Sequence, residues 1–305
     1  MTPGPAAPLI TAGRDAWIDV SVANLWDEPD QARPLDAPSL ANPVDIPAWL
    51  AAMTVDDRRW LVDRLVTQAL YGDRVTVDEV AGDWARVVVL RQPTSLDPRG
   101  YPGWLPTAQL TTVGPSPGAL GDAVVTRPSA SLRIDDGRQL EVSFNTRLPA
   151  VGTNEDQVMV SVPGGRVGRL SAAAVDEDPA PPSGEDVVRS AQLFLGVDYL
   201  WAGTSSSGWD CSGFTSAVYA AHGIVIPRDA HDQAVAGTAV DQADLRAGDL
   251  LFFGADSVTH VGMYVGDGRM IQAPATGRQV ETVSIDAPGV ADRFLAARRY
   301  LPPGA

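Results

Sequence analysis

Sulfur and imidazole groups are scarce in this sequence. Its 305 residues include one cysteine, Cys211, and three histidines, His222, His231 and His260. A single cysteine excludes an internal disulfide, and the paired Cys and His spacings of common metal sites are missing, so we do not expect a metal. We expect no other cofactor. A lone cysteine is more often a small buried hydrophobe than a nucleophile, so its surroundings must decide its role.

Positive charge and long apolar runs are also lacking. The chain carries 23 Lys and Arg against 38 Asp and Glu, a formal net charge of −15. Nucleic acids and anionic membrane surfaces are therefore poor partners. The N-terminus has no basic start followed by an apolar run, and no run reaches about 18 apolar residues. We expect a soluble cytoplasmic protein, or an exported one if a signal precedes the given sequence.

The N-terminal third alternates short strand-like segments with turn residues, which is typical of a small β-barrel. Between the first two segments, Thr54 and Asp57 match a capping box, and Trp60, Leu61 and Leu65 share a helical stripe. We expect a first barrel at residues 1–113 with a helical insertion at about 43–68. The strand segments are 17–26, 74–80, 83–90 and 101–106.

A joint rich in Gly and Pro, GPSPGALGD from Gly114, precedes a second group of short strand-like segments. Their close spacing predicts a smaller barrel at residues 114–175. The run DEDPAPPSG follows, and its acidic residues and prolines predict an extended linker at 176–184. The strand segments of this second barrel are 123–129, 131–135, 139–144, 157–162 and 166–171.

The pattern changes to helices followed by strands in residues 185–305, which predicts an α+β domain. Ser183 and Asp186 form a capping box that starts a helix, and Gly196 closes it. A second helix is expected to begin at Cys211 and to stop at Gly223, because apolar residues recur at helical spacing between them. The strand segments are 249–253, 260–265, 269–273 and 294–301.

The position of Cys211 favours a nucleophile over a packing residue. A helix N-terminus or a nearby imidazolium lowers the pKa of a thiol and makes it competent to attack. Ser212 and Gly213 keep the first helical turn slim, so a substrate carbonyl can approach the sulfur. Free backbone N–H groups there would then receive the oxyanion.

His260 opens an alternating strand, and the hairpin that follows it decides whether Gln272 lies nearby. A two-residue turn would direct Gln272 away from His260. A three-residue loop with Gly268 in the left-handed conformation pairs Gly262 with Gln272, so that its amide can orient the imidazole. We expect this second geometry; the alternatives are a surface histidine and an exposed amide. His222 and His231 are interpreted as solvated.

Several motifs resemble the NlpC family of papain-like cysteine peptidases, which cut bacterial cell-wall peptides. The resemblance covers residues 184–303. It rests on Tyr199-x-Trp201-x-Gly203, on Asp210-Cys211-Ser212-Gly213-Phe214, and on the runs IPRDAHDQ, LRAGDLLFF and HVGMYVGDGRMIQAP.

The N-terminal runs VSVANLWDEP, TQALYGDRVTV and YPGWLP are similar to the first bacterial SH3-like domain of one subgroup of that family. This subgroup hydrolyses the γ-D-glutamyl to diamino-acid bond of murein peptides that carry a free N-terminal L-alanine. The resemblance implies two SH3-like barrels followed by an α+β catalytic domain, with the first barrel closing one end of the substrate site.

The resemblance also implies residue roles. Cys211 would be the nucleophile and His260 the general base and later acid. Gln272 would take the third position, where many relatives have a second histidine. The substrate-binding residues would be Tyr199, Trp201, Asp210, Ser212, Asp73, Tyr101 and Arg228.

These binding roles have structural alternatives. Asp210 would pair with the substrate ammonium. Asp73 and Tyr101 would lie at the same end of the site, or be a turn carboxylate and a barrel-core ring. Tyr199 could instead be a core aromatic residue. Ser212 could simply cap the helix, and Arg228 could form a structural salt bridge.

The function that we expect is hydrolysis of the bond after γ-D-glutamate in murein tripeptides and tetrapeptides, in peptide recycling, by a protein expected to be monomeric. Neither diaminopimelate nor lysine is favoured as the diamino acid. One alternative is an inert wall-peptide binding module, which Gln272 in place of histidine would favour. Another is acyl transfer on lipids, which the murein-type N-terminal domain disfavours.

Overall fold

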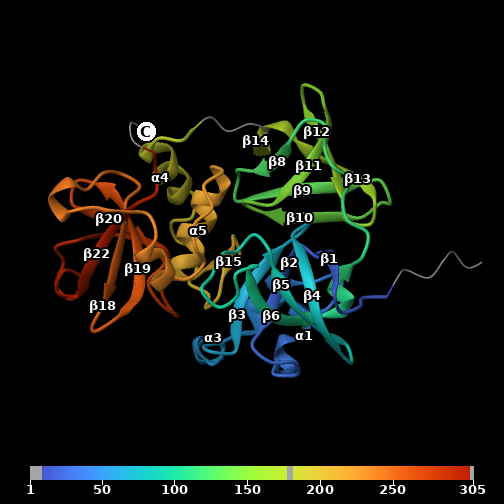
Figure 1. Ribbon diagram of the computed structural model, residues 1–305, viewed down its shortest axis with the longest axis horizontal. Helices are drawn as coiled ribbons and strands as arrows, with labels where there is room; N and C mark the ends of the chain where they lie inside the picture. Colours follow the sequence, from blue (N-terminus) through green and yellow to red (C-terminus); the bar gives the residue numbers. More distant parts are fainter. Residues whose placement is uncertain (1–8, 177–180, 303–305) are drawn as a thin grey trace, which may run out of the picture.

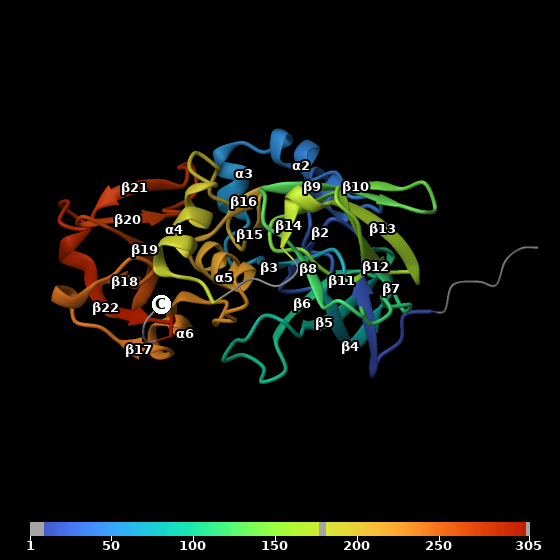
Figure 2. The same ribbon diagram turned by 90° about the horizontal axis from the view of Figure 1, so that it is seen from above.

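The computed structural model describes residues 9–176 and 181–302, which form three domains (Figures 1 and 2). Two antiparallel β-domains lie side by side, and an α+β domain lies next to both of them. The predicted fold class is confirmed. Residues 177–180, in the predicted linker, lie outside the described residues. Among the described helices, none has the length and apolar character that a membrane crossing requires.

The first domain is a seven-stranded antiparallel sheet in the order β3-β2-β6-β5-β4-β1-β7. Its core is aliphatic, with Ile18, Leu25 and Val87 fully buried. The loop between the fifth and sixth strands spans residues 90–100 and leaves the barrel. The strands are β1 (Arg14–Ile18), β2 (Val22–Trp26), β3 (Leu65–Leu70), β4 (Arg74–Ala81), β5 (Trp84–Val89), β6 (Tyr101–Pro106) and β7 (Leu110–Thr111).

The helical insertion begins and ends earlier in the sequence than predicted. It ends at Trp60, and Asp63 then takes a left-handed φ of 60°, so the helix cannot continue. Residues 65–68, expected to be helical, belong to β3, because Leu65 and its neighbours pair with β2. The capping box of Thr54 and Asp57 is confirmed. The insertion comprises a 3-10 turn (Pro34–Asp36), α1 (Ala37–Leu40), α2 (Ile46–Ala52) and α3 (Val55–Trp60).

The second domain has the strand order β10-β9-β13-β12-β11-β8-β14. Strand β11 was not predicted, because Pro149 and Gly152 are residues that strands disfavour. Pro149 lies opposite Asp122 of β8, and a bulge separates Ala150 from Gly152. The strands are β8 (Asp122–Val125), β9 (Ser129–Ile134), β10 (Gln139–Ser143), β11 (Arg147–Thr153), β12 (Gln157–Val162), β13 (Arg166–Ser171) and β14 (Val175–Asp176).

The third domain packs helices against a six-stranded antiparallel sheet in the order β17-β22-β18-β19-β20-β21. Ser183 and Asp186 form the predicted capping box of its first helix. The helices are α4 (Gly184–Gln192), α5 (Cys211–Ala221) and α6 (Ala230–Val235). The strands are β15 (Thr204–Ser205), β16 (Gly208–Trp209), β17 (Thr238–Ala239), β18 (Leu250–Gly254), β19 (Val258–Gly266), β20 (Arg269–Gln272), β21 (Glu281–Ser284) and β22 (Phe294–Arg299).

Helix α5 lies between the sheet of the third domain and the two barrels (Figure 1). A buried aromatic cluster packs against the N-terminal half of this helix. Phe194 contacts Trp209 and Phe214 edge to face, with ring centroids 4.9 and 6.2 Å apart, and all three side chains are fully buried. Such pairs stabilise a core beyond their buried area.

Both barrels contact the third domain near the two ends of α5. From the first barrel, the 90–100 loop reaches across, and the carbonyl of Pro93 accepts from the backbone N–H of Arg228 at 2.8 Å (Figure 2). The backbone N–H of Ser95 donates to Asp232 of α6 at 2.8 Å. From the second barrel, the guanidinium of Arg147 donates to the carbonyl of Ala220, in the last turn of α5. A cationic group at the C-terminal end of a helix interacts favourably with the helix dipole.

The first turn of α5 fits closely against the preceding loop. A Cβ added to Gly213 would lie 2.2 Å from the carbonyl oxygen of Gly203. We expect Gly213→Ala to lower the free energy of unfolding by about 1–3 kcal/mol, although alanine is the better helix former. Denaturant titration measures this change. Ser216→Ala, in the same helix, is the control, and equal stability of the two variants would contradict the expectation.

Candidate active site

Cys211 is the first residue of α5, as predicted. Asp210 is the N-cap, and its side chain accepts a hydrogen bond from the backbone N–H of Gly213 at 2.6 Å. This bond satisfies one of the free N–H groups of the first turn. The N–H of Cys211 has no carbonyl partner within the helix, because it begins the helix. The side chain of Cys211 is partly exposed and lines two cavities.

The thiol is not activated in the resting protein. Burial, followed by the nearby carboxylate of Asp210, raises the pKa of Cys211 to about 12. Hydrogen bonds from the backbone of Val261 and Ser212 act in the opposite direction but do not outweigh burial. The expected lowering of the thiol pKa at the helix N-terminus is therefore outweighed by burial, and a base must remove the proton during attack.

His260 and Gln272 lie together, as the hairpin register predicted. Met263 pairs with Ile271 and Tyr264 with Met270, which places Gly262 opposite Gln272. The loop itself differs from the prediction. Gly266 pairs with Arg269, so the turn contains two residues with positive φ, and a bulge at β19 restores the register.

The amide of Gln272 is held in one orientation. Its Oε1 lies 2.7 Å from Nε2 of His260, and its Nε2 donates to Oε1 of Glu281 at 3.1 Å. Arg278 pairs with the same carboxylate. Because a carboxylate only accepts, the amide N–H₂ must face Glu281 and the amide oxygen must face His260. His260 therefore carries its proton on Nε2, and Nδ1 is the nitrogen that can act as base.

His260 is mostly uncharged at neutral pH. Burial lowers its pKa below the ordinary value of 6.5, and Arg293 adds to this effect, whereas the hydrogen bond to Gln272 opposes it. Sequence reasoning placed the base correctly beside an amide but could not give its protonation state. A neutral thiol and a neutral imidazole are the resting pair.

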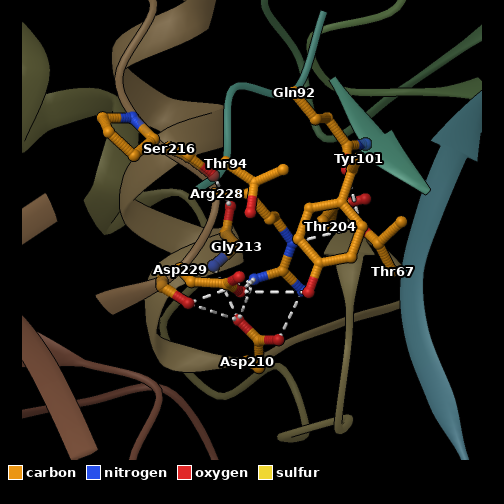
Figure 3. A network of polar contacts seen from close by, with 12 residues as sticks. Thr67, Gln92, Thr94, Tyr101, Thr204, Asp210, Gly213, Ser216, Arg228 and Asp229 are labelled. Atoms are coloured by element: carbon orange, nitrogen blue, oxygen red, sulfur yellow. Dashed lines mark hydrogen bonds and ion pairs between the residues drawn. The ribbon is translucent and has the colours of Figure 1, made fainter. Parts of the chain in front are cut away.

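Asp210 is engaged by Arg228, a residue that is 2% exposed. The guanidinium donates from Nη2 to Oδ2 at 2.5 Å and from Nη1 to Oδ1 at 3.1 Å, a bidentate ion pair (Figure 3). The same arginine donates to the hydroxyls of Ser212 and Thr67, each at 3.1 Å. Arg228 thus forms a structural ion pair with Asp210, and the guanidinium balances the negative charge of the Asp210 carboxylate.

Asp229 is a residue that the sequence did not single out. Its Oδ1 accepts from the hydroxyl of Tyr101 at 3.4 Å and lies 3.8 Å from Nη1 of Arg228. Figure 3 shows the side chains of Asp210 and Asp229 next to that guanidinium. Two carboxylates therefore share one arginine, and burial raises the pKa of Asp229. Its position next to Arg228 was the available signal, but nothing local distinguishes it from other turn aspartates.

Cys211 and Tyr199 lie where two cavities meet. One cavity, about 320 Å³ in volume, is lined by His260 and Gln272. The other, about 560 Å³, is lined by Asp210, Ser212, Arg228 and Asp229 of the third domain and by residues of the first barrel. The first-barrel residues that line it are Asp27, Asp63, Leu65, Val66, Leu96 and Tyr101.

The remaining predicted residues are distributed differently. Trp201 lines the larger cavity, and its indole N–H donates to the carbonyl of Leu65 at 2.9 Å. Asp73 lines neither of these cavities. It accepts from the backbone N–H of Leu70 at 2.8 Å and lies 3.8 Å from Arg91, near a separate cavity. Asp73 is therefore a turn carboxylate.

The other two histidines are outside the catalytic pair. His222 is half-buried and bonded to the hydroxyl of Ser190 at 2.9 Å, so its interpretation as solvated was wrong. His231 is exposed, and its ring lies within 4.8 Å of ligand atoms of Asp229 and Asp232. Asp232 already binds the backbone N–H of Ser95, which ties it to the 90–100 loop.

Comparison with known proteins places these features in a family. Residues 196–299 match the model of the NlpC/P60 family, and residues 125–176 match that of the YKFC SH3b2 domain. A gamma-D-glutamyl-L-lysine dipeptidyl-peptidase of Bacillus cereus is 44% identical, covering 94% of this chain and 91% of that protein. One of the same name from Bacillus subtilis is 39% identical, covering 92% and 96%.

A solved structure supports the full-length likeness. The crystal structure of an NlpC/P60 family protein from Bacillus cereus is 43% identical to this chain and superposes with a TM-score of 0.89. The match covers 94% of this chain and 100% of that one. The arrangement of the three domains around the cleft is therefore shared, not only the fold of each domain.

The buried ion pair generates a stability prediction. Arg228→Met leaves the carboxylate of Asp210 buried without its partner, so we expect the free energy of unfolding to fall by about 3–5 kcal/mol. Arg189→Met, which breaks an exposed pair with Asp186, is the control and should cost at most about 1 kcal/mol. Denaturant titration compares them, and similar losses for both variants would contradict the assignment.

The protonation state of His260 can be observed directly. Because burial disfavours the imidazolium, more acid is needed to protonate the ring. We therefore expect the proton NMR resonances of His260 to titrate with a midpoint below pH 6.5. A His260→Gln spectrum assigns the signal among three histidines. A midpoint above pH 6.5 would show that the resting base is charged and would overturn the neutral pair.

Proposed function

Because this chain belongs to the NlpC/P60 family, we propose that it is a cysteine peptidase that hydrolyses the γ-D-glutamyl to L-lysine bond of cell-wall peptides. The observation that carries this function is the placement of Cys211 at the start of α5, in the same cavity as the hydrogen-bonded pair of His260 and Gln272. A thiol, an oriented base and a free helix N-terminus are the parts that acyl transfer needs.

The first half of the reaction forms an acyl-enzyme. Sγ of Cys211 attacks the γ-carbonyl carbon of D-glutamate while its proton moves to Nδ1 of His260. The N-terminus of α5 receives the oxyanion. The C–N bond then breaks, and His260 gives its proton to the departing amine of the diamino acid. Gln272 orients the imidazole and accepts from its Nε2–H throughout.

The second half restores the enzyme. Water attacks the thioester carbonyl and loses a proton to His260, and the C–S bond breaks as His260 returns that proton to the sulfur. The products are the dipeptide L-Ala-γ-D-Glu, with a new γ-carboxylate, and a free thiol. Since the resting thiol and imidazole are both uncharged, proton transfer is coupled to attack in each half.

The acyl part of the substrate belongs in the larger cavity, because the acidic residues are there. Asp229 is the carboxylate best placed for the ammonium of the N-terminal L-alanine, since Asp210 is bound by Arg228 in a bidentate pair. Tyr101 supports Asp229 from the first barrel. A carboxylate beside an aromatic hydroxyl favours a charged amine over an acylated one.

We further propose that the substrates are short released peptides, such as tripeptides and tetrapeptides. Six residues of the first barrel line the larger cavity, and this lining supports an end that is closed against a glycan-linked peptide. Recycling of released peptides in the cytoplasm, by a monomer, is the role that fits this specificity. The net charge of −15 favours solubility and disfavours binding to anionic surfaces.

Turnover of L-Ala-γ-D-Glu-L-Lys tests this function. We expect release of L-Ala-γ-D-Glu by the reduced protein, and loss of at least about 10³-fold in kcat for Cys211→Ala, because no other thiol is present. The N-acetylated peptide should be cut at least about tenfold more slowly in kcat/KM, because its amine is uncharged.

The controls separate the alternatives. Ser257 is exposed and lines neither cavity, so Ser257→Ala should keep full activity. Asp229→Asn should reduce the preference for the free amine, whereas Cys211→Ala abolishes turnover of both peptides. Peptide binding without any turnover by the parent protein would instead favour the inert binding module.

A further inference from the structure

The two cavities that meet at Cys211 differ in charge. Four aspartates line the larger one, Asp27, Asp63, Asp210 and Asp229, and its arginine, Arg228, is paired with Asp210. The smaller cavity has the opposite character. Arg278 and Arg293 line it, and no Asp or Glu is among the described residues of its lining. The cleft is therefore acidic on one side of the nucleophile and basic on the other.

Among the described residues that line the basic side, Arg293 is the arginine without a carboxylate partner. It ends the 3-10 turn Ala291–Arg293, is exposed, and donates from Nη2 to the hydroxyl of Thr259 at 3.4 Å. In the described parts of the chain, no carboxylate oxygen lies within 4.0 Å of its guanidinium nitrogens. Thr259 directly precedes His260 in β19, so this charge lies beside the base.

Arg278 differs from Arg293 because its charge is shared. It pairs with Glu281, which in turn accepts from the amide of Gln272. This ion pair fixes the orientation of the amide and leaves Arg278 a secondary contributor to anion binding. An arginine that faces a cavity without a carboxylate partner is well suited to bind a substrate carboxylate.

The direction of the substrate follows from the proposed function, on which this inference rests. The acyl part, with its ammonium, occupies the acidic side, and His260 must protonate the departing nitrogen. The diamino acid therefore leaves through the smaller cavity. The ammonium of a lysine side chain would find no carboxylate in its described lining, whereas a carboxylate would find Arg293.

We propose that Arg293, assisted by Arg278, binds a carboxylate of the diamino-acid residue on the leaving side. The enzyme then recognises its substrate at both ends, an ammonium at Asp229 and a carboxylate at Arg293. That carboxylate has two possible sources. It is the α-carboxylate when the diamino acid is C-terminal, or the side-chain carboxylate when the diamino acid is diaminopimelate.

Three peptides distinguish these sources. L-Ala-γ-D-Glu-L-Lys, the lysine acid, has only the α-carboxylate on its last residue. The same peptide with a C-terminal carboxamide, the lysine amide, has no carboxylate on that residue. L-Ala-γ-D-Glu-meso-diaminopimelate with an α-carboxamide offers only the side-chain carboxylate. We expect the parent protein to cut the lysine acid about tenfold more efficiently than the lysine amide in kcat/KM. Equal efficiency of the diaminopimelate peptide and the lysine acid would assign the side-chain carboxylate as a second ligand of the same site.

In Arg293→Gln, the ratio of kcat/KM for the lysine acid to kcat/KM for the lysine amide (the acid-to-amide ratio) should fall close to one. Arg269→Gln is the matched control, because Arg269 is an exposed arginine of the same domain that lines neither cavity, and it should keep the ratio. If the parent protein cuts the lysine acid and the diaminopimelate peptide no faster than the lysine amide, or if its preference for a carboxylate survives in Arg293→Gln, this inference is overturned and the peptidase function stays intact. Absence of turnover with every peptide overturns both.

Discussion

The buried ion pair of Asp210 and Arg228 is the interaction on which the site depends. One carboxylate caps the helix that begins with Cys211 and also receives a bidentate guanidinium. That guanidinium binds Thr67 of the first barrel, and its backbone N–H binds the carbonyl of Pro93. Because two buried charges require full mutual satisfaction, the pair ties the helix start, the cavity wall and the first barrel into one arrangement.

This arrangement sets the chemistry of the nucleophile. Burial beside an anionic carboxylate disfavours a thiolate, so Cys211 rests as a thiol, and burial keeps His260 neutral. Gln272 supplies a neutral acceptor for the imidazole N–H, and the carboxylate of Glu281 holds the amide in the orientation that this role requires. The neutral amide of Gln272 is thus oriented by the ion pair of Glu281 and Arg278.

The accessory domains contribute to the cavity wall as well as to the position of the catalytic helix. The first barrel supplies Tyr101 and part of the larger cavity, and its 90–100 loop is tied to α6 through Asp232. The second barrel reaches the C-terminal end of the catalytic helix through Arg147. Charge is distributed across the cleft accordingly, with aspartates on the side of the first barrel and arginines on the side of the sheet. Under the proposed function, a short zwitterionic peptide is expected to bind in the direction that matches this polarity.

Local patterns in the sequence determined most of the fold and the catalytic pair. Capping boxes at Thr54 and Ser183, alternating strands and the helix start at Cys211 depend on near neighbours, and so does the register that brings Gln272 beside His260. Pairing with distant strands decided that residues 65–70 form β3, and packing of the first barrel against the third domain placed Tyr101 beside Asp229. Burial and charge balance also set the protonation states. These quantities depend on residues far apart in the chain, so only the tertiary structure could supply them.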